Sequence, residues 1–125
     1  MTEPQTIHEL AKWLTRVCTS ENPPNSVVAY NVGLFETSDG YTAYLAGAKR
    51  FDGIDGDWAC DEAFTPAERY CPISAEGFSD WHGVHIAAVK TLRDFLLSPS
   101  GKSSFLANAK ALTVGFDDGD LERLK

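Results

Sequence analysis

Carboxylates are concentrated in the stretch FDGIDGDWACDE, residues 51–62, which contains no Lys or Arg. Crowded carboxylates raise one another's proton affinity unless a cation or a basic partner neutralises them. The stretch therefore predicts a surface that contacts a cationic partner, formed by Asp52, Asp55, Asp57, Asp61 and Glu62. The simpler interpretation is a solvated loop that keeps the protein soluble, because runs of like charge usually face water.

A second acidic segment near the C-terminus adds Asp117, Asp118 and Asp120 to the predicted partner-binding residues. If the two segments share one rim of the fold, their combined negative field raises the association rate of a cationic partner. Trp58, inside the first segment, is also predicted to contact the partner, because binding hot spots favour Trp. Trp is large and apolar, so packing with Phe64 in the core is the more usual role for such a residue.

The residue spacing does not predict a metal site or a cofactor. An EF-hand loop requires D-x-[DN]-x-[DN]-G and a Glu at position twelve, whereas the stretch from Asp52 has the wrong first spacing and Ala63 at position twelve. His82 and His85 in DWHGVH supply two of the three or four ligands that zinc needs, and the only other His is His8. We expect His85 to be a hydrogen-bonded core residue instead.

Catalytic motifs are also missing, and no catalytic residue is predicted. SGKSS ends like a phosphate-binding loop, but Leu96 occupies the position of that motif's first Gly. Cys60 lies among carboxylates, which raise the pKa of a thiol, and Cys71 precedes a Pro with no His nearby. Cys18 lies on a helix face that should be buried. No G-x-S-x-G or H-E-x-x-H pattern occurs.

The elements that position these residues begin with a helix, for which Thr6 and Glu9 form a capping box. One face of this helix is apolar, and ENPPN at 21–25 ends it. The face consists of Ile7, Leu10, Ala11, Leu14, Val17 and Cys18. Alternating apolar residues then predict a β-hairpin over 26–50, which turns at Asp39-Gly40.

WACDEAF is predicted as a third strand, and ERYCPI as a fourth strand or an edge piece ended by Pro72. A long helix follows over 79–97 with Ser79 as its cap. Its wide apolar stripe comprises Trp81, Val84, His85, Ile86, Ala88, Val89, Leu92 and Phe95 or Leu96. A short helix is expected over 103–110, then ALTVGF as the last strand.

This order predicts a single α+β domain over residues 1–125, in which two main helices pack on one face of an antiparallel or mixed sheet of four to five strands. The chain of 125 residues, 43% hydrophobic, is long enough to close a core without cross-links. We expect a monomer or a homodimer.

The overall charge narrows the class of partner. A net charge of −7 repels polyanions, so we expect neither nucleic acid nor an anionic membrane as a direct partner. Three Cys without a CxxC pair are typical of reduced thiols in a cytoplasm. The N-terminal residues lack the features of a signal peptide, and no apolar run approaches the ~18 residues of a membrane span. These observations predict a cytoplasmic protein.

The capped helix, the hairpin VVAYNVGLFETSDGYTAYLAGAKRF and the segment DGDWACDEAFTP together resemble small acidic bacterial immunity proteins of polymorphic toxin systems. The resemblance covers about the first half of the chain and rests on general character, so it assigns no residue a role. It implies a noncatalytic cytosolic inhibitor that occupies a toxin's active site, often with acidic side chains in place of the phosphates of a nucleic-acid substrate.

We therefore expect a noncatalytic acidic binding protein whose partner is a basic protein, with a nuclease-type toxin, inhibited by occlusion, as one candidate. Two alternatives stay open. A small enzyme of unknown reaction would use a carboxylate/His pocket lined by Glu62, His82 or His85. A scaffold or regulatory module would dimerise through an exposed sheet edge.

Overall fold

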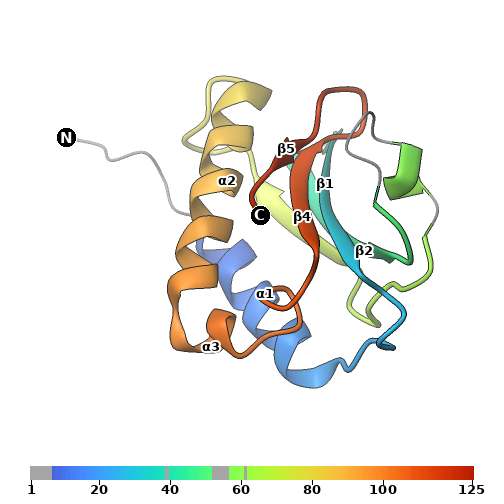
Figure 1. Ribbon diagram of the computed structural model, residues 1–125. Coiled ribbons are helices and arrows are strands. Elements are labelled where there is room, and N and C mark those ends of the chain that lie inside the picture. The colour runs from blue at the N-terminus through green and yellow to red at the C-terminus, as the bar shows by residue number, and fades with distance from the viewer. Residues whose placement is uncertain (1–6, 39, 52–56, 61) are drawn as a thin grey trace.

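A mixed sheet with helices packed across one face makes up the computed structural model of this chain, which describes residues 7–38, 40–51, 57–60 and 62–125 (Figure 1). The described residues form five strands in the order β3-β2-β1-β4-β5. The strands are β1 Ala29–Thr37, β2 Gly40–Ala48, β3 Tyr70–Ser74, β4 Ala111–Phe116 and β5 Glu122–Arg123, and the helices are α1 His8–Ser20, η1 Asp57–Cys60, α2 Trp81–Leu97 and α3 Pro99–Lys102. The predicted α+β class is confirmed.

The predicted hairpin is the centre of the sheet. Strands β1 and β2 pair antiparallel from Ala29 opposite Ala48 to Thr37 opposite Gly40. Gly40 has φ +151°, a conformation that L side chains rarely adopt, which explains the turn signal in the sequence. Asp39 lies outside the described residues. Strand β4 pairs parallel with the other edge of β1, so the two strands end at the same side of the sheet.

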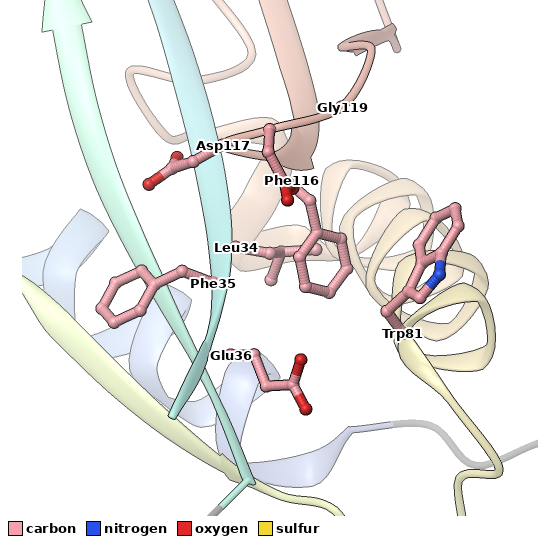
Figure 2. Close-up of a pocket in the computed structure, with 8 residues that line it drawn as sticks. Leu34, Phe35, Glu36, Trp81, Phe116, Asp117 and Gly119 are labelled. Carbon is pink, nitrogen blue, oxygen red and sulfur yellow. The ribbon is translucent and has the colours of Figure 1, made fainter. Parts of the chain in front are cut away.

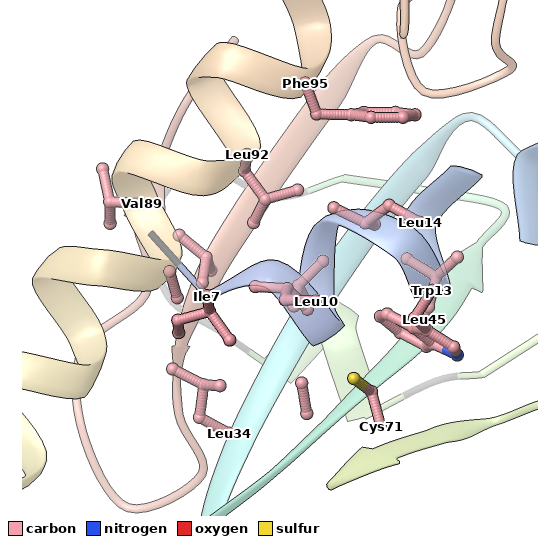
Figure 3. Packing of buried hydrophobic residues seen from close by; sticks show 14 of the residues in the cluster. Ile7, Leu10, Trp13, Leu14, Leu34, Leu45, Cys71, Val89, Leu92 and Phe95 are labelled. Carbon is pink, nitrogen blue, oxygen red and sulfur yellow. The ribbon is translucent and has the colours of Figure 1, made fainter. Parts of the chain in front are cut away.

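The main core lies between the sheet and the helices. Leu34 of β1 and Leu45 of β2 lie among residues of α1 and α2 (Figure 3), and Val32, which alternates with Leu34 along β1, belongs to the same buried cluster. Helix α1 buries Leu10, Trp13, Leu14 and Val17 on its inner face. Trp13, which the predicted apolar face omitted, is fully buried, and its Nε1 donates to the carbonyl oxygen of Glu68 at 2.7 Å. This bond satisfies the one polar atom of the indole.

Helix boundaries differ slightly from the predicted ones. Helix α1 begins at His8 after Ile7, which makes no side-chain cap bond, while Thr6 lies outside the described residues. Helix α2 is capped by Asp80 instead of Ser79, because Asp80 Oδ1 accepts hydrogen bonds from the backbone N–H groups of His82 and Gly83.

The short helix predicted over 103–110 is misplaced. It lies earlier in the chain, at Pro99–Lys102, and residues 103–110 form turns without regular helix. Pro99 is compatible with the first helical turn, and the Ser98 hydroxyl accepts from the N–H of Gly101 at 3.1 Å. The stop signal SPSG in the sequence is therefore also the start of the next helix.

The third strand predicted at WACDEAF does not form. Residues 57–60 make a short 3₁₀ helix, and Phe64 forms only an isolated bridge with Gly47. Trp58 instead packs against the face of the sheet that the other helices leave uncovered, where Ala29, Ala48 and Ala111 provide room for its ring. The neighbour of β2 is therefore β3, an edge strand that continues past Pro72. An edge position tolerates Pro because its missing N–H need not face a partner strand.

None of the helices formed by the described residues is long and apolar enough to cross a membrane.

Candidate functional site: an acidic–aromatic cleft

The parallel strands β1 and β4 end side by side at a cleft of about 590 Å³ (Figure 2). The backbone N–H of Asp117 donates to the carbonyl oxygen of Leu34 at 3.0 Å and holds the two strand ends together. A turn closed by the N–H of Gly119 on the oxygen of Phe116, also at 3.0 Å, follows at once. The cleft is lined by Leu34, Phe35, Glu36, Trp81, Phe116, Asp117, Asp118 and Gly119, and we call it the acidic–aromatic cleft.

Trp81 is the most exposed aromatic side chain of this cleft. It is 54% exposed although the sequence places it on the apolar stripe of α2. Its ring meets Phe116 edge to face at a centroid distance of 5.7 Å, and Phe116 packs in the same way on Tyr41 at 5.8 Å. Trp81 is therefore supported by the core while part of its surface stays open to a ligand. Ile86, also predicted on the stripe, is exposed as well.

The cleft carries three carboxylates and no cationic side chain. Glu36, Asp117 and Asp118 are exposed, and the lining contains no Lys or Arg. In the part of the chain that the structure describes, the ion pairs join other carboxylates: Glu62, Glu68, Asp94 and Glu122. In Figure 2, Glu36 extends to the same side of β1 as Phe116 and Trp81, whereas Asp117 and Phe35 extend to the other. The cleft therefore offers uncompensated negative charge on both sides of the strand ends.

Asp117 is oriented by a tyrosine from the neighbouring hairpin strand. The hydroxyl of Tyr44 donates to Asp117 Oδ1 at 2.5 Å. Burial raises the pKa of Tyr44, and the bond to Asp117 with the charges of Asp117 and Glu62 raises it further. The hydroxyl thus stays protonated and keeps one carboxylate oxygen engaged.

The Tyr44 ring lies over Gly33, its partner in the β1–β2 register, where a Cβ would come within 2.1 Å of the ring. The sequence signal for this arrangement is the Gly opposite a Tyr in the hairpin, a pair to which the predicted hairpin assigns no role. Glu36 and Trp81 were likewise missed as site residues. Glu36 lies near the end of a predicted strand without other acids beside it, and Trp81 fitted a buried helical stripe.

The first acidic segment is described only in part. Asp52, Asp55 and Asp61 lie outside the described residues, as does the side chain of Asp57. Glu62 is neutralised within the chain, because Arg69 Nη2 donates to its two carboxylate oxygens at 3.0 and 2.9 Å. Whether the two acidic segments share a rim stays a prediction, although Glu62 and Asp117 both act on the Tyr44 hydroxyl.

The structure places the other predicted site residues in different surroundings. Asp117 and Asp118 line the cleft, and Asp120 is exposed beyond its lining. Trp58 is only 2% exposed, in contact with a cluster of alanines, and this burial corrects its proposed role as a partner anchor. The core interpretation holds because small residues on three neighbouring strands leave space for one large ring.

The residues of the alternative catalytic pocket do not converge on this cleft. His85 Nε2 lies 3.1 Å from Glu122 Oε1, so the predicted hydrogen bond is confirmed, but the side chain is 16% exposed and lies outside the two buried clusters instead of in the core. His82 is exposed at the start of α2, and Glu62 is paired with Arg69. None of these three residues lines the acidic–aromatic cleft.

Two of the thiols are unreactive at neutral pH. Burial raises the pKa of Cys18 and of Cys71 to about 11, so both stay protonated there. Among the described residues, no group of three or more His, Cys, Asp or Glu side chains is placed to hold a metal ion.

No protein-family model, curated protein or solved structure matches this chain.

Proposed function

We propose that this protein is a noncatalytic binding protein whose acidic–aromatic cleft contacts a basic protein partner. One observation carries the proposal: three exposed carboxylates and a half-exposed Trp line the same cleft, and no cationic side chain of the lining compensates them. Trp is a preferred residue of binding hot spots, and complementary charge favours a cationic partner over a neutral one.

The partner class follows from charge and from the resemblance in the first half of the chain. A net charge of −7 accelerates encounter with a basic protein. A nuclease-type toxin has such a basic surface, because it must bind phosphates. In that case the carboxylates of the cleft would take the place of the substrate phosphates, and inhibition would follow from occlusion of the toxin's active site.

The test is the affinity for the captured partner. Wild-type protein is used to capture basic proteins from the source lysate at low and high salt, and the captured protein is then purified and titrated. The cleft variant carries Glu36→Gln, Asp117→Asn and Asp118→Asn. The matched control carries Glu9→Gln, Glu76→Gln and Asp94→Asn, which remove the same charge from exposed positions outside the cleft.

We expect the cleft variant to bind the purified partner at least about tenfold more weakly, because contacting charges act mainly on dissociation. The control should stay within about twofold of wild type, since scattered surface charges contribute little to a contact. Equal affinities of the cleft variant and the control would overturn the proposal.

A further inference from the structure

An arginine bound between aromatic rings and a carboxylate already exists within this chain. The guanidinium carbon of Arg69 lies 5.6 Å from the ring centroid of Tyr44 and 5.4 Å from that of Tyr70. The same guanidinium donates to both carboxylate oxygens of Glu62. One planar cation is therefore held by two aromatic rings and by a single Nη2 group that donates to a carboxylate, while its buried Nε has no hydrogen-bond partner among the described residues.

The acidic–aromatic cleft presents the same chemical groups without a cation. Trp81 supplies a large ring with more than half of its surface exposed, and Glu36 extends on the same side of β1 (Figure 2). Asp118 adds a second exposed carboxylate to the lining, which has no Lys or Arg. A volume of about 590 Å³ is ample for one long side chain.

We infer that the cleft binds an arginine side chain of the partner, with its guanidinium stacked on Trp81 and hydrogen-bonded to Glu36 or Asp118. This inference rests on the proposed function and names the chemical group that the cleft recognises. Trp has the strongest cation–π attraction of the aromatic residues. A carboxylate can accept two parallel N–H bonds from a guanidinium, a geometry that lysine does not offer.

Trp81 itself provides the signal for a direct test. Trp13 and Trp58 are buried, so Trp81 is the one Trp of the chain whose ring a dissolved peptide can reach. The probes are three blocked tripeptides, acetyl-Gly-X-Gly-amide, in which X is arginine, lysine or citrulline. Citrulline keeps the shape and most of the polar groups of arginine but has no charge. Each peptide is titrated to about 20 mM, because a single side-chain contact reaches only millimolar affinity.

The arginine peptide should change the Trp81 fluorescence in a saturable way. We expect the lysine peptide to bind about fivefold or more weakly, because it loses stacking and bidentate bonding. The citrulline peptide should give no saturable change at the same concentrations. Lysine binding as tightly as arginine would overturn the assignment of a guanidinium, and so would the absence of any response to arginine.

Charge-removing variants distinguish binding in the cleft from general electrostatic attraction to the protein. The double variant Glu36→Gln with Asp118→Asn should bind the arginine peptide about tenfold more weakly than wild type. The double variant Glu76→Gln with Asp94→Asn removes the same charge outside the cleft and should bind this peptide with unchanged affinity. Trp81→Leu should also lower the affinity for the arginine peptide. This affinity is measured by calorimetry, because the variant lacks the fluorescent reporter. Equal affinities of the two double variants would place arginine binding outside the cleft and overturn the inference.

The failure of this inference is distinguishable from failure of the proposed function. If the purified partner depends on the cleft carboxylates while the arginine peptide does not bind, the inference is wrong and the proposed function stands. If the partner is also insensitive to the cleft variant, both are wrong.

Discussion

At the scale of single residues, Tyr44 links two parts of the surface that are far apart in the sequence. Its hydroxyl donates to Asp117, and its ring lies beside the guanidinium of Arg69, which pairs with Glu62. These four residues come from β2, the segment after η1, the position just before β3 and the position just after β4. A cleft carboxylate is thereby tied to the last residue of the first acidic stretch.

Tyr44→Phe should lower the free energy of unfolding by about 1 kcal/mol, because it removes one hydrogen bond to a carboxylate and keeps the ring. Tyr41→Phe is the matched control, because the Tyr41 hydroxyl makes no hydrogen bond with the described residues. Its expected cost is within about 0.5 kcal/mol. Urea unfolding measures both variants, and equal costs would show that the bond to Asp117 contributes nothing to stability.

Cys71 should make stability sensitive to alkaline pH. Burial raises the pKa of its thiol from 9.0 to about 11, so between these values the unfolded chain loses a proton that the folded chain keeps. The stabilisation is complete below pH 9 and declines as the pH rises toward 11. We expect this thiol to account for a loss of up to about 2 kcal/mol, measured by urea unfolding at pH 8, 9.5 and 11.

Cys71→Ala is the corresponding control, since it removes the titrating group at a buried position. The variant will be less stable at every pH because it leaves a small cavity, but its decline above pH 9 should be shallower. An identical slope in wild type and Cys71→Ala would assign the alkaline loss to other groups.

At the scale of elements, local signals predicted the hairpin and α2, because a turn and a helical period depend on neighbours in sequence, although the cap of α2 is Asp80 and not Ser79. One failure involves contacts between distant segments, and the other involves a local helix start. WACDEAF has the composition of a strand, yet Trp58 packs on the sheet instead of pairing along its edge. Residues 103–110 have helical composition, but Ser98 and Pro99 start the helix earlier.

Alanine substitution of two glycines near the ends of α2 should change the stability of the protein in opposite directions. A Cβ at Gly101 would lie 1.6 Å from the carbonyl oxygen of Phe95, so Gly101→Ala should cost more than about 2 kcal/mol by forcing α3 away from α2. A Cβ at Gly83 would meet only the Phe78 side chain, at 3.4 Å or more. Gly83→Ala should therefore stabilise α2 by about 0.5–1 kcal/mol.

Thermal unfolding of the two variants measures these effects, with wild type as the reference. A drop in melting temperature for Gly101→Ala together with a rise for Gly83→Ala is the expected pattern. Similar melting temperatures for both variants would show that the close contact between α2 and α3 can relax at little cost.

At the scale of the whole molecule, the net charge and the cleft should act on different steps of partner binding. General charge steers encounter and depends on salt, whereas contacting groups hold the complex together. We predict that Asp55→Asn, Asp57→Asn and Asp61→Asn together lower the association rate a few-fold and flatten its salt dependence. The cleft variant, Glu36→Gln with Asp117→Asn and Asp118→Asn, should raise the dissociation rate about tenfold or more.

The association and dissociation rates can be measured separately by binding each variant to surface-immobilised partner at low and at moderate salt. The control variant at Glu9, Glu76 and Asp94 has the same net charge as the other two, so it shows how much of the change in association is due to total charge alone. If the variant at Asp55, Asp57 and Asp61 has the same association rate as this control, the first acidic segment has no special role in the encounter with the partner.

The sequence alone determined the fold class, the hairpin with its Gly40 turn, the long helix and the negative charge, because these depend on periodicity, local backbone preference and composition. Only the tertiary structure decided which acids meet and which are neutralised. Arg69 reaches Glu62, Tyr44 reaches Asp117 across 73 positions, and the parallel pairing of β1 with β4 brings Glu36 and Asp118 to one cleft. Such contacts depend on the order of the strands and on which end of a helix lies over the sheet. Neither property produces a periodic pattern in the sequence.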